Sequence, residues 1–225
     1  GEASGLLEQI KVLRVKQCYP LLLSAISVEI PKGQFKALLR AIIRVSILRG
    51  LTDRNPNELE DIYAKNARLL RKKKSENIEN ILKEIMKFSI NEDEINRYVL
   101  DNDVSEQLAR FILSQYELSQ RSDEIRIGKV SIEHIMPRTP ENIKDWNMSG
   151  EKHEHLVGQL GNLTLVSTRL NQKASNRSFS EKIKILKKSE IKSTSELARL
   201  HEKWGEKEIK ERTSKLIEFT LKNWK

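Results

Sequence analysis

The chain of 225 residues contains a single cysteine, Cys18, and only 5% aromatic residues. One thiol can form neither an internal disulfide nor a cysteine-built zinc site. No apolar run approaches the roughly 18–20 residues that a bilayer crossing needs. The opening residues place no basic side chain ahead of an apolar core, so no signal peptide is predicted. We therefore expect a cytoplasmic protein without a membrane segment.

Charged residues are abundant but unevenly distributed, within a formal net charge of +9. Residues 121–225 carry 22 lysines and arginines against 15 acidic residues, whereas residues 1–120 carry 19 against 17. A basic half joined to a near-neutral half indicates a polyanionic partner for the C-terminal part. A solvated, lysine-rich surface would produce the same balance.

The apolar residues of the first 120 positions recur with the period of an α-helix. We expect Gly50 to end one such helix, and Ser75 and Ser105 to be the N-caps of two others. The region shows no Gly-rich phosphate loop and no catalytic cluster, so we interpret residues 1–120 as a helical bundle domain. The clearest apolar stripe consists of Phe35, Leu38, Leu39, Ile42 and Ile43.

The pattern changes after a polar stretch at residues 119–129, which we take as a domain boundary. Residues 130–136 and 163–166 are expected to be short strands, and residues 141–158 a polar connection. Ser178 and Glu181 have capping-box spacing at the start of a following helix. The predicted fold class is α+β and mostly helical, with residues 121–225 forming a small β element among helices.

Four polar residues lie in or near these apolar strands. Glu133 and His134 lie side by side in the first strand, just before Pro137. Asn162 follows His134 by 28 positions and opens the second strand, and Asn171 comes nine positions later in a polar segment. Each piece alone is common on solvated strands, but the combination is specific.

This order of residues resembles the HNH nucleases, whose ββα-metal core holds one divalent ion. The segments Ile-Glu-His-Ile-Met-Pro (132–137) and Leu-Gly-Asn-Leu-Thr-Leu (160–165) are similar to those in the HNH module of GmrSD-type modification-dependent restriction enzymes. The resemblance implies an N-terminal helical region, followed by a ββα-metal core with surrounding C-terminal helices. The chain then corresponds to the C-terminal effector part of such an enzyme.

The resemblance also implies a role for each polar residue. Glu133 and Asn171 are expected to bind one Mg²⁺ or Mn²⁺ ion through hard oxygen ligands. His134 is expected to be the general base, acting near its unperturbed pKa. Asn162 is expected to hydrogen-bond backbone across the loop and so orient His134. Asn176 is close enough to Asn171 in sequence to compete for the ligand role.

Neighbouring residues of a regular strand point to opposite faces. Glu133 and His134 can face one ion only if the backbone departs from strand geometry, and we expect that departure here. Further side chains are expected to contact DNA phosphate; these are His155, Lys173, Arg177 and Lys182.

The predicted activity is metal-dependent DNA endonuclease or nickase activity in a bacterial anti-phage restriction system. Its predicted partners are double-stranded DNA and a nucleotide-dependent, modification-sensing domain outside these 225 residues. Two alternatives stay open at this point. One is a DNA-binding or scaffold module with an inactive nuclease core, and the other is an RNA nuclease.

Overall fold

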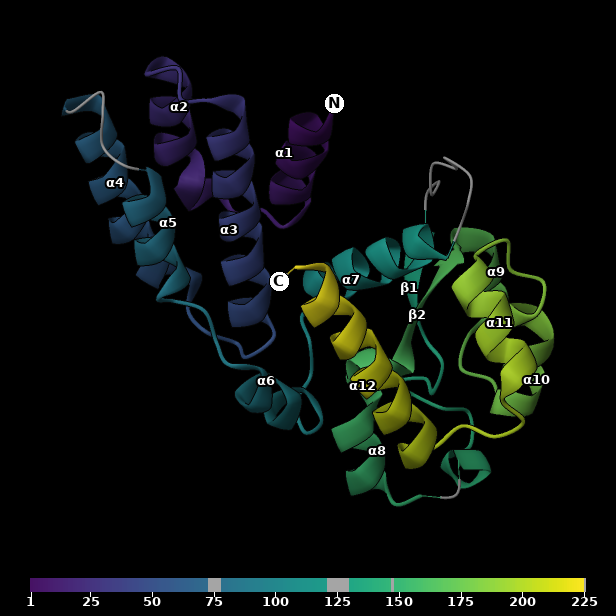
Figure 1. Ribbon diagram of the computed structural model, residues 1–225. Coiled ribbons are helices and arrows are strands. Elements are labelled where there is room, and N and C mark those ends of the chain that lie inside the picture. Colours follow the sequence, from purple (N-terminus) through teal and green to yellow (C-terminus); the bar gives the residue numbers. More distant parts are fainter. Residues whose placement is uncertain (73–77, 121–129, 147, 225) are drawn as a thin grey trace. The chain divides into compact units, whose positions relative to one another are not determined.

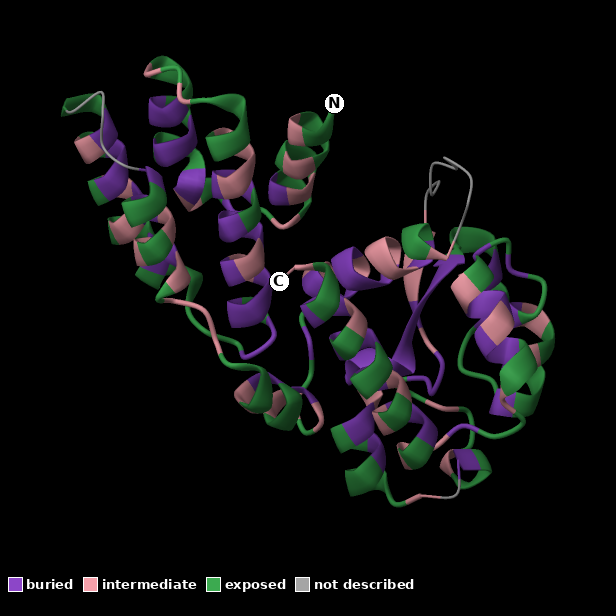
Figure 2. Ribbon diagram, viewed as in Figure 1, coloured by how far each residue is buried: buried purple, intermediate pink, exposed green. Residues whose placement is uncertain are grey.

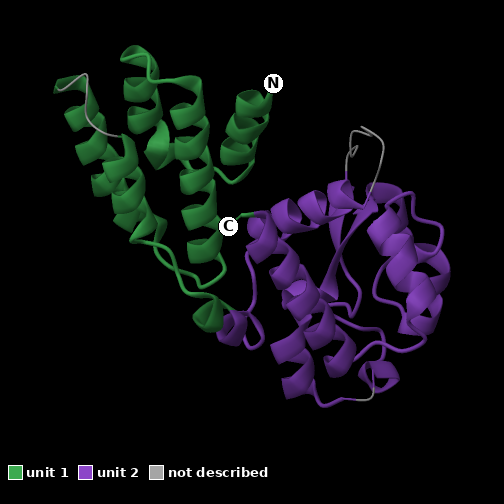
Figure 3. Ribbon diagram, viewed as in Figure 1, with its two compact units in different colours: residues 1–95, 224–225 green, residues 96–223 purple. Residues whose placement is uncertain are grey.

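The computed structural model describes the chain except for residues 73–77, 121–129, 147 and 225 (Figure 1). The chain divides into two compact units (Figure 3). Unit 1 comprises residues 1–95 and 224–225, and unit 2 comprises residues 96–223. The fold is α+β and mostly helical, as the sequence predicts. None of the helices in the described part combines the length and apolar character of a membrane span.

Unit 1 is built from helices alone among its described residues. Helix α6 (Glu92–Val99) begins in this unit and continues into unit 2. The other elements are α1 (Glu2–Val12), η1 (Lys16–Cys18), α2 (Tyr19–Ser27), α3 (Lys32–Gly50), η2 (Pro56–Leu59), α4 (Glu60–Lys72) and α5 (Ile78–Met86).

The predicted apolar stripe forms the inner face of α3, which ends at Gly50 as expected. Four of its members, Leu38, Leu39, Ile42 and Ile43, are completely buried. This face contacts α1 and α5, while α2 contacts α4. The predicted N-cap Ser75 lies outside the described residues.

Unit 2 places two short strands among six α-helices and two 3₁₀ helices of its described residues. These elements are α7 (Glu106–Ser119), β1 (Val130–His134), η3 (Ile143–Trp146), α8 (Gly150–Val157), η4 (Leu160–Asn162), β2 (Leu163–Ser167), α9 (Thr168–Ala174), α10 (Phe179–Leu186), α11 (Lys192–Leu200) and α12 (Glu206–Asn223).

Strands β1 and β2 pair antiparallel, with His134 opposite Leu163 and Val130 opposite Ser167. Strand β1 ends two residues earlier than predicted, because Ile135 and Met136 turn into the core instead of continuing the ladder. Strand β2 is buried except at its last residue (Figure 2). Strand β2 is therefore an interior element of unit 2, whereas β1 is mostly half-buried.

A hydrophobic core cluster of unit 2 includes the residues that follow β1 and aromatic rings from η3, α10 and the segment between α11 and α12. Phe179 of α10 stacks on Trp204, with ring centroids 5.9 Å apart. The whole cluster consists of Ile135, Met136, Trp146, Leu156, Phe179, Leu197, Trp204 and Ile209. It fixes the position of the segment that follows His134.

A tight backbone approach joins η4 to α12. A Cβ atom at Gly161 would lie 1.9 Å from the carbonyl oxygen of Ile209. The Gly161 N–H donates to Thr213 Oγ1 at 2.9 Å, and Arg212 donates to the Gly161 carbonyl at 2.6 Å. Only glycine permits this contact, which holds Asn162 against the long C-terminal helix.

Two local predictions were wrong. Residues 141–158 are not an irregular connection, because they contain helix α8, which is capped by Ser149. Ser178 does precede α10, but its hydroxyl donates to Glu181 at 3.1 Å instead of accepting a backbone N–H. Ser105 caps α7 as predicted, accepting the N–H of Leu108.

The compact units divide between Ile95 and Asn96, so α7 belongs to the unit that holds the strands. The predicted domains, 1–120 and 121–225, stay a prediction. Most of the polar stretch on which that boundary was placed, 121–129, lies outside the described residues.

Candidate active site at the end of the first strand

His134 is the last residue of β1, two residues before the predicted end of the strand. Its Nε2 accepts a hydrogen bond from Nε of Arg138 at 3.1 Å. Burial, followed by the charges of Arg138 and Lys182, lowers the pKa of the imidazole to about 4. The ring is therefore unprotonated at neutral pH, as a general base must be. The expectation of a pKa near its unperturbed value was wrong.

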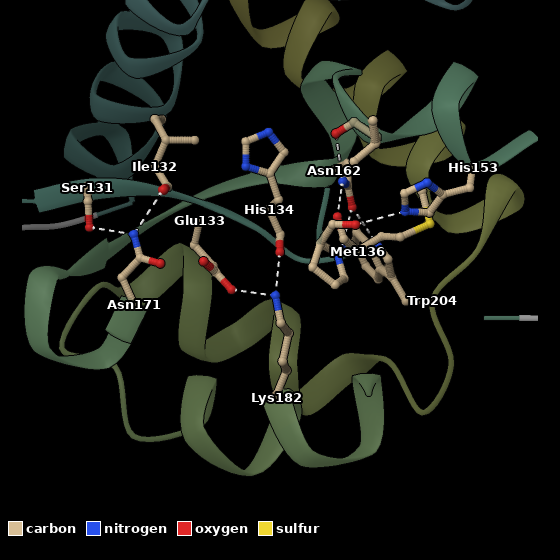
Figure 4. Close-up of polar contacts among 12 residues, drawn as sticks. Ser131, Ile132, Glu133, His134, Met136, His153, Asn162, Asn171, Lys182 and Trp204 are labelled. Atoms are coloured by element: carbon tan, nitrogen blue, oxygen red, sulfur yellow. Dashed lines mark hydrogen bonds and ion pairs between the residues drawn. The ribbon is translucent and has the colours of Figure 1, made fainter. Parts of the chain in front are cut away.

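Glu133 is buried and forms an ion pair with Lys182 of α10 (Figure 4). The Lys182 ammonium donates to Glu133 Oε1 at 2.6 Å and to the His134 carbonyl at 2.7 Å. Burial raises the pKa of Glu133 and lowers that of Lys182, and in each case the partner's charge opposes the shift. Because Lys182 is completely buried, this arrangement does not present it to a DNA phosphate, contrary to the prediction.

Glu133 and His134 point to opposite sides of β1 (Figure 4). Both residues keep their places in the ladder, with Glu133 opposite Thr164 and His134 opposite Leu163. The expected departure from strand geometry at this dipeptide is therefore not seen. The alternation rule of a regular strand holds as far as His134.

Asn162 bridges the loop after His134, as predicted. Its side-chain oxygen accepts the Met136 N–H at 2.8 Å, and its amide nitrogen donates to the Met136 carbonyl at 2.8 Å. The same nitrogen donates to the Val157 carbonyl at 2.8 Å, and Trp204 Nε1 donates to the oxygen at 3.1 Å. This completely buried side chain therefore has every donor and acceptor engaged in holding the loop.

His153 reinforces the same loop from helix α8. Its Nε2 donates to the Pro137 carbonyl at 2.8 Å, and the residue is buried. His155 is exposed, with Nε2 3.8 Å from Asp101. Since α8 is a helix, these two histidines do not share a face as they would on a strand.

Asn171, on α9, lies on the Glu133 side of β1 (Figure 4). Its amide nitrogen donates to Ser131 Oγ at 2.9 Å and to the Ile132 carbonyl at 3.1 Å. Both amide hydrogens are thus used, which leaves the oxygen available to a cation. Asn176 is exposed, and its carbonyl accepts the Glu141 N–H at 3.0 Å.

Two side-chain oxygens on one side of β1 are the candidate ligands for a hard divalent cation. Glu133 keeps Oε2 for a ligand, and Asn171 offers its amide oxygen from the same side of the strand. Mg²⁺ is commonly held by one or two protein oxygens, with water and substrate phosphate completing the shell. Across the described residues no group of three or more His, Cys, Asp or Glu gathers as a metal site. The described residues therefore contain no metal site whose ligands are all His, Cys, Asp or Glu side chains.

Lys173 and Arg177, the other predicted phosphate ligands, are exposed at the end of α9 and just beyond it. Sequence reasoning missed Arg138 and the structural roles of His153 and Trp204. Arg138 carried one usable signal, since it lies four residues after the proposed base in a turn flanked by prolines. The other two contacts depend on tertiary packing and had no local signal.

Unit 2 thus has a small two-stranded sheet, with a histidine of lowered pKa at the end of β1 and an asparagine that closes the following loop. The family model described as GmrSD restriction endonucleases, C-terminal domain, matches residues 63–219. The chain belongs to this family of restriction endonucleases. No curated protein matches the chain.

Proposed function

We propose that unit 2 is a metal-dependent HNH endonuclease or nickase that hydrolyses phosphodiester bonds in double-stranded DNA. Membership of a restriction endonuclease family supports a DNA substrate. The surplus of basic residues in the C-terminal half supports a polyanion in general. We further propose that the chain is the effector of a bacterial anti-phage system, in which a nucleotide-dependent domain senses the modified DNA.

The observation that carries this proposal is the loop held by Asn162. A general base must be positioned within hydrogen-bonding reach of the attacking water. The segment immediately after His134 is fixed by both side-chain atoms of Asn162 and by its carbonyl, which accepts the Ile135 N–H at 2.9 Å. These bonds hold the backbone directly after His134 in one place, which is what positioning of its ring requires.

In the proposed mechanism, His134 accepts the proton of the attacking water. Because Glu133 and His134 point to opposite sides of β1, the scissile phosphate would lie across the end of the strand, between the His134 ring and the ion. Its unprotonated state at neutral pH suits that task, although a low pKa makes it a weaker base than an ordinary histidine. Asn162 positions His134 through the loop. Lys182 fixes one oxygen of Glu133, so that the other is presented in a defined direction.

Glu133 and Asn171 are the residues that would hold the divalent ion. When bound, Mg²⁺ or Mn²⁺ supplies positive charge to the phosphoryl group and the departing 3′ oxygen. Lys173 and Arg177 are proposed to contact the DNA backbone from the end of α9. His155 is proposed to contact it from α8.

The test is nicking of supercoiled plasmid by the full chain with Mg²⁺ or Mn²⁺, compared with His134→Ala and an EDTA control. We expect nicking that requires metal and is lost in His134→Ala, leaving 5′-phosphate and 3′-hydroxyl ends. A 3′-phosphate product would contradict the mechanism. Activity retained by His134→Ala would show that the base is elsewhere.

One observation favours a second function, a DNA-binding module with an inactive nuclease core. The buried ammonium of Lys182 already neutralises Glu133 without a metal ion. Salt-sensitive DNA binding without cleavage, and without measurable Mn²⁺ binding, would support this reading.

Cleavage of RNA in preference to DNA in the same assay would instead identify RNA as the substrate of the nuclease.

A further inference from the structure

The guanidinium of Arg138 contacts the atom that the proposed mechanism needs. Nε of Arg138 donates to Nε2 of His134 at 3.1 Å, and the arginine side chain is otherwise exposed. A nitrogen that accepts a hydrogen bond from arginine cannot simultaneously accept a proton from water. The contact therefore has to open before His134 can act as a base.

The backbone that carries Arg138 is held on its N-terminal side. The Pro137 carbonyl accepts from His153, and both backbone polar groups of Met136 are bound by Asn162. Movement of the guanidinium is thus a rotation of an exposed side chain about a fixed backbone. The guanidinium therefore stays close to the His134 ring when its side chain rotates.

Arg138 has no ion-pair partner among the described residues, and its hydrogen bond goes to Nε2 of His134, an uncharged acceptor that carries no proton. Its charge acts on Asp103, where it opposes the effect of burial on the carboxyl pKa. A guanidinium binds phosphate with two parallel N–H donors, and such charge-assisted bonds are stronger than bonds to a neutral acceptor. A phosphate oxyanion is therefore a better partner for Arg138 than the imidazole it contacts here.

We propose that Arg138 binds the scissile phosphate group and leaves His134 Nε2 as it does so. This inference rests on the proposed nuclease function and deepens it. Arg138 would be a catalytic residue that places the phosphorus atom beside the base. In the DNA-free protein, the same side chain covers the base.

The first experiment needs neither metal nor cleavage. Diethyl pyrocarbonate acylates free imidazole nitrogens, and mass spectrometry of peptides reports each histidine separately. We expect His134 to react severalfold faster in Arg138→Gln than in the wild type, with His155 as an internal reference. Arg199→Gln is the matched control, since it removes an exposed arginine of α11 from the same unit. Equal reactivity of His134 in the wild type and in Arg138→Gln would show that Arg138 does not cover His134 Nε2.

The second experiment measures binding of a short DNA duplex in EDTA as a function of salt. Loss of one phosphate contact in Arg138→Gln should reduce the salt slope by roughly 0.9. Arg138→Lys should keep the slope, because it keeps the charge. An unchanged slope in Arg138→Gln, or no DNA binding by the wild type, would overturn the phosphate contact.

The third measurement separates this inference from the proposed function. At saturating DNA, Arg138→Gln should nick plasmid about 100-fold more slowly than the wild type, as when one oxyanion donor is removed. Faster nicking by Arg138→Gln would show that Arg138 covers His134 but does not bind the phosphate. If the wild type binds DNA without nicking and Arg138→Gln still lowers the slope, the nuclease proposal fails and the phosphate contact stands.

Discussion

Lys182 and Glu133 form a buried ion pair, with the ammonium nitrogen 2.6 Å from Oε1, that ties α10 to the end of β1. The side chains of both residues are almost completely inaccessible to solvent. Because neither side chain is exposed to water, each charged group is stabilised mainly by the other. The pair is also directly adjacent to the proposed base, because Lys182 donates to the His134 carbonyl.

Removing one partner of this pair should be strongly destabilising. In Lys182→Met the buried carboxylate of Glu133 loses its counter-charge, and we expect unfolding to require about 3–5 kcal/mol less free energy. Urea denaturation measures this. Lys184→Met, an exposed change on the same helix, is the control. The double variant Glu133→Gln/Lys182→Met should recover part of the loss, and no recovery would contradict the ion-pair explanation.

Asn162→Ala should damage both stability and activity. The change leaves the Met136 N–H and the Val157 carbonyl without their side-chain partner, and each such buried group costs about 1–3 kcal/mol. Urea denaturation should show a loss of at least about 2 kcal/mol. Plasmid nicking, measured where the variant is still folded, should also fall. Full nicking by a folded Asn162→Ala protein would contradict the positioning role.

Asn171 and Asn176 can be separated by direct metal titration. We expect Asn171→Ala to weaken Mn²⁺ binding, measured by calorimetry or electron paramagnetic resonance, because its amide oxygen faces the Glu133 side of β1. Asn176→Ala should bind Mn²⁺ like the wild type, since that residue is exposed. The reverse result would assign the ligand to Asn176. A thermal melt checks that Asn171→Ala, which also loses its bond to Ser131, stays folded.

Gly161→Ala should destabilise unit 2 substantially. The added Cβ would meet the carbonyl oxygen of Ile209 at 1.9 Å, and that atom belongs to the backbone of α12 and cannot rotate away. We expect a clear fall in the melting temperature. Gly150→Ala is the matched control, because nothing lies within 4 Å of its Cβ position. A similar melting temperature for both variants would contradict the close approach.

Cys18 should be inert in the native protein. Burial raises the pKa of its thiol to about 12, and its Sγ donates to the Val15 carbonyl at 2.9 Å. Because thiolate is the reactive form, almost none is present at pH 8. Iodoacetamide at that pH should label Cys18 in urea-unfolded protein but not in native protein. Rapid native labelling would show that this part of unit 1 opens readily.

The sequence predicted what depends on local period and on the order of motifs. The structure contains the predicted apolar stripe of α3, the end of that helix at Gly50, the N-cap at Ser105 and the two strands. The bridging bonds of Asn162 also follow the prediction. Each of these is set by neighbours in sequence or by a motif whose spacing is specific.

What failed depends on tertiary packing. Lys182 looks like a surface cation in sequence, and only the fold shows that its stem and ammonium are enclosed beside Glu133. Helix α8 escaped notice because it buries only His153 and Leu156, which gives too short an apolar pattern. The low pKa of His134 similarly reflects its burial in the fold, together with the charges of Arg138 and Lys182.

The bonds of Asn162 join the two ends of the connection that leads from His134 to Asn162, residues 135–161. Lys144, which is exposed in this connection, lies outside the bonds that hold the backbone beside the histidine. We expect an insertion beside Lys144 to be tolerated if Trp146 keeps its place in the core and Glu141 its bond to Asn176. A reporter peptide or a new recognition loop inserted there should leave the catalytic geometry in place.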